Sequence, residues 1–94
     1  MDSDRLKIEK LIKDNTVTLI AGTINATGKT FYWKSEVETS IGDYAIAKNM
    51  NGYDLIKVVG IVTTTKANAS KFSNTNYENM KEIVLGIKKE LIEK

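Results

Sequence analysis

The chain has 94 residues, of which 41% are hydrophobic and 28% are charged, and its formal net charge is +2. This size and composition indicate one globular domain over residues 1–94 and exclude a disordered chain, while the near balance of charge gives no general electrostatic argument for nucleic-acid binding. Cysteine and histidine are both absent, which excludes disulfides and the usual ligands of zinc.

The N-terminal segment alternates charges and has no unbroken apolar run. We therefore expect neither a signal peptide nor a membrane-spanning helix, and we expect the protein to be cytoplasmic. Ile8, Leu11 and Ile12 have helical spacing, which predicts a short amphipathic helix over residues 4–13. Because so short a helix is marginal alone, its apolar stripe is expected to dock on the rest of the domain.

From residue 16 the apolar period changes to two, which predicts a sheet with strands over residues 16–24, 30–36, 44–48 and 53–64. Two hairpin turns are predicted, one at Asn25-Ala26-Thr27-Gly28 and one at Asn51-Gly52. Gly60, inside the last strand, predicts a bend or a bulge.

The remainder of the chain is predicted as an ordered polar connection over residues 66–75, held by Phe72, followed by a helix over residues 76–93. Thr75 and Glu78 fit a capping box. A stripe at helical spacing supports the helix: Met80, Ile83, Val84, Ile87 and Leu91. Leu85 and Ile92 lie off this stripe, so a homodimer through this C-terminal helix is an alternative to simple core packing.

Together these elements predict an α+β fold, in which a small antiparallel β-sheet or barrel of four or five strands is flanked by an N-terminal and a C-terminal helix. Trp33 is expected in the core beside Phe31, packed by Val58 and by the residues 83–87 of the C-terminal helix.

Gly28-Lys29-Thr30 is similar to the end of a phosphate-binding loop, but the spacing and the context argue against one. Gly22 and Gly28 enclose five residues, whereas the motif requires four residues and a following helix. The residues after Thr30 are predicted to continue as a strand. A hairpin turn is therefore the favoured interpretation.

Few side chains are suited to catalysis, because without histidine or cysteine a general base would have to be a carboxylate, lysine or tyrosine with a shifted pKa. Glu36, Glu38 and Asp43 could together hold a hard cation such as magnesium, but solvated surface charges are the favoured interpretation. We expect a non-enzymatic protein with no catalytic residues, no metal and no cofactor.

Alternation along the predicted strands yields one candidate interaction surface. If Phe31 and Trp33 face the core, Tyr32 and Lys34 point outward, and Lys48, Tyr53 and Lys57 of the second hairpin could join them. Interleaved aromatic and basic groups on an open sheet can stack bases and neutralise phosphates. The plainer interpretation is that these residues only decorate the strands.

Three segments in succession resemble a known barrel pattern: Lys29-Thr30-Phe31-Tyr32-Trp33, then residues 41–47 (IGDYAIA), then residues 52–62 (GYDLIKVVGIV). The order resembles the N-terminal DNA-end-binding barrel of the primosomal helicase and, in short length, small phage and prophage proteins. The likeness covers about residues 29–62 and is formed by residues that make the fold, so it implies a barrel and carries over no binding residue.

The phage-like resemblance implies three function classes. The leading one is a small accessory protein that inhibits a host protein, such as a defence component, by occupying its surface. The alternative is a nucleic-acid-binding barrel, and the third is a protein that sequesters nucleotides. Phosphate contacts would make affinity fall steeply with salt, whereas a protein interface with an apolar centre should resist it.

Overall fold

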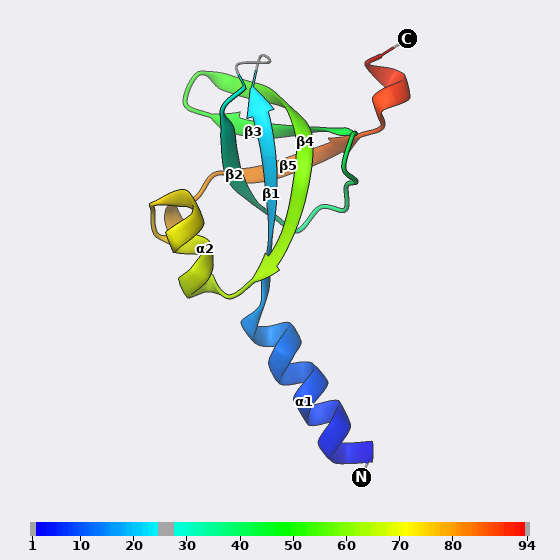
Figure 1. Ribbon diagram of the computed structural model, residues 1–94, viewed down its shortest axis with the longest axis vertical. Helices are drawn as coiled ribbons and strands as arrows, with labels where there is room; N and C mark the ends of the chain where they lie inside the picture. The colour runs from blue at the N-terminus through cyan, green and yellow to red at the C-terminus, as the bar shows by residue number, and fades with distance from the viewer. Residues whose placement is uncertain (1, 25–27, 94) are drawn as a thin grey trace.

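Five strands pair around a closed ring in the order β1-β2-β5-β3-β4 (Figure 1). This is a computed structural model that describes residues 2–24 and 28–93. The strands are β1 (Val17–Ile24), β2 (Thr30–Ser35), β3 (Tyr44–Asn49), β4 (Gly52–Thr64) and β5 (Glu82–Ile87). The helices are α1 (Asp2–Asn15) and α2 (Lys66–Ser73), with short 3-10 turns η1 (Tyr77–Asn79) and η2 (Lys89–Leu91). The predicted α+β class with a mainly antiparallel sheet is confirmed.

Both predicted hairpins are present. Strands β1 and β2 pair antiparallel, and the turn residues 25–27 between them lie outside the described residues. In the second hairpin, Asn49 pairs with Gly52, whose φ of 137° suits glycine. The predicted bulge is also found beside Gly60, because Ala21 pairs with Gly60 whereas the next residue of β1 pairs with Val58, so that β4 has one extra residue.

The interior of the ring is a core built around Trp33, which is only 3% exposed. Its buried companions are Ile20, Ala45, Ala47, Ile56, Val58 and Ile83. The prediction that Val58 and Ile83 pack with Trp33 is thus confirmed, although Ile83 comes from a strand. Phe31 was predicted in the core beside Trp33, but this is wrong: it lies at the edge of the barrel, 38% exposed, with its ring centroid 6.2 Å from that of Trp33.

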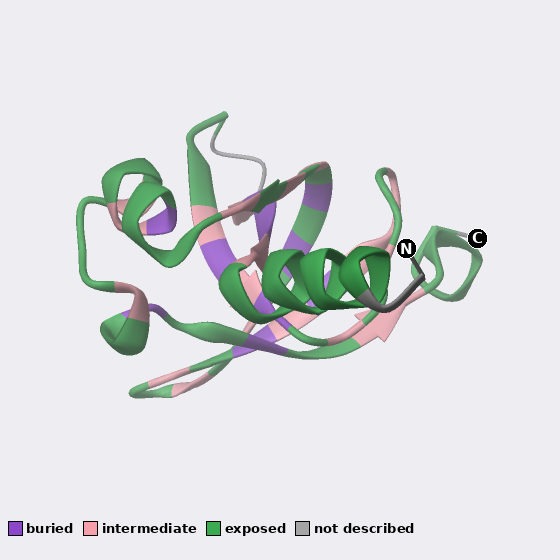
Figure 2. Cartoon of the chain, turned by 90° about the horizontal axis from the view of Figure 1, so that it is seen from below, coloured by how far each residue is buried: buried purple, intermediate pink, exposed green. Residues whose placement is uncertain are grey.

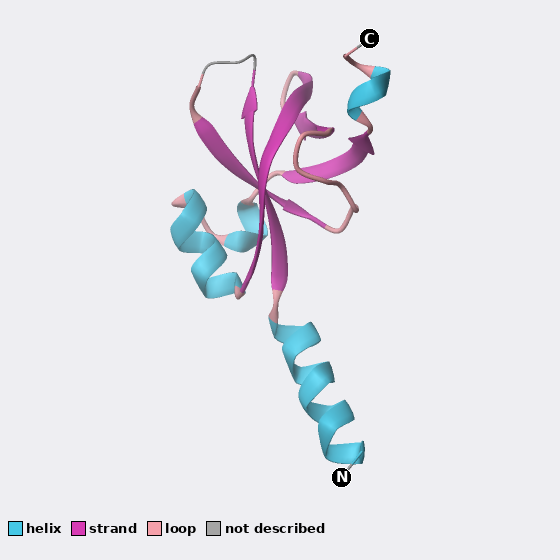
Figure 3. Ribbon diagram, turned by 45° about the vertical axis from the view of Figure 1, so that its right-hand side comes forward, coloured by secondary structure: helices cyan, strands magenta, loops and turns pink. Residues whose placement is uncertain are grey.

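A second, smaller core lies on the outside of the sheet beneath α2. Leu19, Ala69 and Met80 are buried there, with Tyr32 and Tyr77 packed against them. Helix α2 therefore packs over β1 and β2 on the outside of the ring (Figures 1 and 3). The opposite side of the ring, formed by β3, β4 and β5, has no such cover among the described helices.

The predicted polar connection over residues 66–75 is wrong, because most of it is α2. Thr65 caps the helix by accepting a hydrogen bond from the Asn68 backbone N–H at 3.3 Å, and Asn74 ends it in the left-handed conformation with φ 57°. One of its apolar side chains, Ala69, is fully buried against the sheet. Only the predicted role of Phe72 is retained, since its ring packs on Tyr32 at a centroid distance of 5.3 Å.

The predicted C-terminal helix over residues 76–93 is also wrong, so the helix through which the alternative of a homodimer was considered does not form. Residues 82–87 form β5, which pairs in parallel with β2 and antiparallel with β3. The physical reason is that β-branched Ile83, Val84 and Ile87 fit a strand as well as a helical stripe, and as a strand these residues find backbone partners on both β2 and β3, which closes the ring.

Helix α1 forms where it was predicted but does not dock on the domain. Every residue from 4 to 15 is exposed, and the helix extends away from the barrel (Figures 2 and 3). A single residue, Thr16, separates its end from the start of β1, so the chain has no connection long enough to fold the helix back. Within the described ranges, no helix is both long and apolar enough to cross a bilayer.

Candidate functional site

Strands β3, β4 and β5 carry large side chains on the outside of the ring, arranged in three neighbouring rows. We call the surface formed by these three rows the outer face. The middle row is apolar: Ile46 on β3 pairs directly with Leu55 on β4 and with Leu85 on β5. Leu55 is 42% exposed and Leu85 is 52% exposed. Cross-strand partners on one face are close neighbours, so the three side chains form a continuous apolar row that no described helix covers.

Polar and aromatic residues lie on both sides of this row. Lys48 pairs with Tyr53 on one side, and Tyr44 pairs with Lys57 on the other. Tyr53 is 67% exposed. Together with the middle row, these four residues complete the outer face, which has an apolar centre and a rim of tyrosine and lysine.

The alternation in β3 explains why large apolar side chains point outward here. Ala45 and Ala47 are fully buried, whereas Tyr44, Ile46 and Lys48 occupy the outside. The interior must accommodate the Trp33 ring, and small alanines leave room for it. The larger residues of this strand are therefore left on the outer face.

The rim carries two lysines whose ammonium groups are weakly engaged. Lys57 Nζ lies 5.7 Å from the Tyr44 ring centroid and 3.8 Å from Glu93 Oε2, with both side chains of that ion pair about half exposed. Such an exposed pair contributes little. Lys48 is exposed, and within the described ranges no acidic group lies within ion-pair distance of it.

The five predicted binding residues do not lie together. Lys48, Tyr53 and Lys57 belong to the outer face, but Tyr32 and Lys34 lie on the other side of the ring, next to α2 and η1. Tyr32 is half-buried in the smaller core. The sequence interpretation placed all five on one open face of the sheet, whereas closure into a ring separates β2 from the β3–β4 hairpin.

Lys34 has a structural environment of its own. Its Nζ donates to the carbonyl oxygens of Tyr77 and Glu78, both at 3.3 Å, and lies 5.1 Å from the Tyr77 ring centroid. Lys66 Nζ lies 5.7 Å from the same centroid. Burial, together with the carboxylates of Glu36, Glu82 and Glu78, raises the pKa of the Tyr77 hydroxyl. The Tyr77 ring meets both lysines through its π face.

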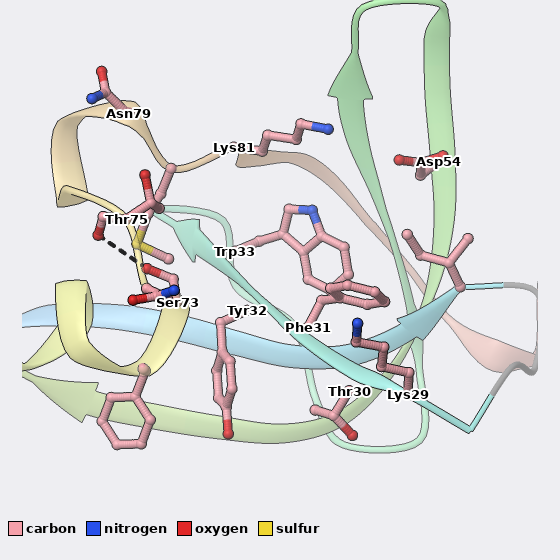
Figure 4. Close-up of a pocket in the computed structure, with 14 residues that line it drawn as sticks. Lys29, Thr30, Phe31, Tyr32, Trp33, Asp54, Ser73, Thr75, Asn79 and Lys81 are labelled. Atoms are coloured by element: carbon pink, nitrogen blue, oxygen red, sulfur yellow. Dashed lines mark hydrogen bonds between the residues drawn. The ribbon is translucent and has the colours of Figure 1, made fainter.

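A groove of about 580 Å³ lies between β2 and the connection from α2 to β5 (Figure 4). Phe31 and Tyr32 line it from β2, and Lys29 and Lys81 stand at its edges. The Lys29 ammonium lies 5.1 Å from the Phe31 ring centroid. Asp54 also lines the groove, so its charged side chains are two lysines and one carboxylate.

The two other motifs of the sequence have ordinary surroundings. Gly28-Lys29-Thr30 leads into β2 and not into a helix, as the hairpin interpretation predicted. The Asp43 carboxylate accepts a hydrogen bond from the Lys89 backbone N–H at 3.0 Å and lies 3.7 Å from Lys88 Nζ. Across residues 2–24 and 28–93, no three acidic side chains gather closely enough to hold a metal ion.

Sequence reasoning missed the residues at the centre of the outer face: Ile46, Leu55 and Leu85. A usable signal was present in Tyr44-Ala45-Ile46-Ala47-Lys48, where the larger residues share a face with a lysine and only alanines occupy the other.

Comparisons with protein-family models, with curated proteins and with solved structures each found no match to this chain.

Proposed function

We propose that the chain is a non-enzymatic binding protein that acts by occupying the surface of another protein with its outer face. The observation that carries this proposal is the uncovered apolar row of Ile46, Leu55 and Leu85. Protein interfaces have an apolar centre and a polar rim, and tyrosine is among the residues enriched in them. Contiguous exposed apolar side chains ringed by polar ones mark such interaction sites.

The chemistry of the rim points to the kind of partner. Lys48 and Lys57 flank the apolar row from opposite sides, so a complementary surface is apolar at its centre and acidic at its edges. The resemblance to small phage proteins supports a component of a host defence system as the partner class. The proposed mechanism is inhibition by occupancy, which requires buried area and no reacting group.

Two of the residues that would favour nucleic acid are already engaged within the chain. Tyr32 packs on Phe72, and Lys34 donates to two backbone carbonyls. The outer face that remains has an apolar centre, and base stacking needs exposed aromatic faces along a basic track. These contacts support a protein partner over a nucleic acid.

Nucleic-acid binding remains the second candidate because of the groove between β2 and the connection from α2 to β5. Phe31 offers a partly exposed ring there, and Lys29 and Lys81 could neutralise phosphates. The two candidates use different surfaces, so variants of one surface leave the other intact.

The test is affinity capture from host lysate, with and without nuclease, using the wild-type chain, Leu85→Glu and the control Leu6→Glu. Leu6 is 64% exposed and lies on α1, away from the outer face. We expect a nuclease-resistant protein partner that is retained by the wild type and the control and lost with Leu85→Glu. Equal recovery with Leu85→Glu, or loss of the partner on nuclease treatment, would overturn the proposal.

A further inference from the structure

Helix α1 presents an apolar stripe that no other element of the described residues covers. Ile8, Leu11 and Ile12 are between 58% and 61% exposed. At 100° per residue they lie within an arc of roughly 100°, and Leu6 lies about 170° from its centre. The helix is joined to β1 through Thr16 alone, so the described part of the chain leaves the stripe exposed to other molecules.

We propose that α1 pairs with α1 of a second copy of this chain in an antiparallel arrangement. Ile8 of each copy would then pack beside Leu11 of the other, with Ile12 at the edge of the same seam. This surface is separate from the outer face, so the pairing is independent of the proposed function.

The charges at the edge of the stripe favour this occupant. Lys7 and Asp14 lie at nearly the same angle around the helix, next to Leu11. Antiparallel pairing about the centre of the stripe brings Lys7 of one copy beside Asp14 of the other, and the two-fold symmetry repeats the contact. Arg5 and Glu9 on the other edge already form an ion pair within the helix at 3.3 Å.

The shape of the molecule favours the antiparallel arrangement over the parallel one. The described residues measure 51 × 30 × 21 Å, and α1 lies at one end of the longest axis, with the barrel at the other (Figure 1). Packed helices lie about 8–10 Å apart, which is less than the width of the barrel at the end of α1. Parallel helices would force the two barrels together, whereas antiparallel helices place them at opposite ends.

The size of the seam sets the strength of the pairing. The helix has 14 residues, and a pair of such helices buries less than the roughly 1,200 Å² of a standard interface. The dimer is therefore weak, with a dissociation constant on the order of 100 µM. An isolated helix of this length is marginal in water, so pairing also raises its helix content.

Sedimentation equilibrium across this concentration range, combined with far-ultraviolet circular dichroism, tests the proposal. We expect the wild type to dimerise and its helix signal to rise with concentration. Leu11→Lys should weaken dimerisation by about tenfold or more, since it places a charge in the seam. Leu6→Lys makes the same change on the opposite side of the helix and should leave the dissociation constant within about twofold.

A charge exchange identifies the orientation. Lys7→Asp should weaken the dimer by about threefold or more, and adding Asp14→Lys in the same chain should restore it. A wild-type chain that stays monomeric at every concentration would overturn the proposal. So would equal losses for Leu11→Lys and Leu6→Lys, and a double variant no stronger than Lys7→Asp would overturn the antiparallel arrangement.

Discussion

Gly22 on β1 lies against Ile56 on β4 in the barrel interior, with no space for a Cβ between them. A Cβ built on Gly22 would also lie 2.8 Å from the carbonyl oxygen of Lys57 and 3.4 Å from the Trp33 ring. The carbonyl oxygen of Lys57 belongs to the backbone, so it cannot move aside without shifting a strand. The close approach of β1 and β4 at the bulge thus depends on glycine.

The first prediction follows from this contact. Gly22→Ala should lower the free energy of unfolding by about 1–3 kcal/mol, because overpacking a dense core forces backbone shifts. Gly60→Ala is the matched control, since its Cβ would meet only the Cβ of Ala21 at an ordinary 3.4 Å. Urea denaturation of both variants measures the difference. Equal stability of the two would show that β1 and β4 are less tightly packed than described.

The second prediction concerns the core. Trp33→Ala should lower the free energy of unfolding by about 3–5 kcal/mol, since it removes the largest side chain in the barrel and leaves a cavity. Tyr53→Ala, at an exposed site of the outer face, should change stability by less than about 0.5 kcal/mol. Thermal and urea unfolding provide the measurement. A Trp33→Ala variant as stable as the control would place the ring at the surface.

The third prediction distinguishes a strand from a helix over residues 82–87. In a helix, Gly86→Ala would stabilise the chain by about 1 kcal/mol because alanine has the higher helix propensity. In β5, the added Cβ would lie 2.9 Å from the Glu38 carbonyl oxygen, so the same change should destabilise it by about 1–3 kcal/mol. The sign of the change in urea midpoint decides between the two.

The fourth prediction separates the two tyrosines that the sequence placed on one face. Tyr53→Ala should weaken partner binding by about tenfold while leaving the fold intact, because an exposed aromatic can anchor an interface. Tyr32→Ala should instead cost about 2 kcal/mol of stability, since its ring packs on Phe72 and the small core. Binding and unfolding measured on both variants check this assignment. If Tyr53→Ala and Tyr32→Ala weakened binding equally and neither lowered stability, the two residues would belong to one binding surface and this assignment would be wrong.

The predictable parts of the fold are those set by local sequence. The β1–β2 and β3–β4 hairpins follow from period-two alternation and turn residues such as Asn51-Gly52, and the bulge follows from Gly60. Residues 80–91 were predicted as part of a helix, since Met80, Ile83 and Ile87 fit helical spacing. Residues 82–87 form β5 because they pair with β2 and β3, which are distant in the sequence. No local pattern reveals that pairing.

The candidate site was predictable in part for the same reason. Lys48, Tyr53 and Lys57 were found from alternation within one hairpin. Leu55 shares a face with Tyr53 and Lys57 by the same alternation but was not singled out, and Leu85 was missed because residues 82–87 were assigned to a helix and not to β5. Tyr32 was misplaced because α2 was not expected to cover β2.

The most direct test of the protein-binding claim is calorimetric titration of the captured partner with the wild-type chain and with Leu85→Glu over a series of salt concentrations. We expect wild-type affinity to fall by less than about tenfold between roughly 50 and 200 mM salt, and Leu85→Glu to abolish binding at every salt concentration. A loss of about 10³-fold or more over that range, as for a ligand held through many phosphates, with Leu85→Glu binding as well as the wild type, would contradict it.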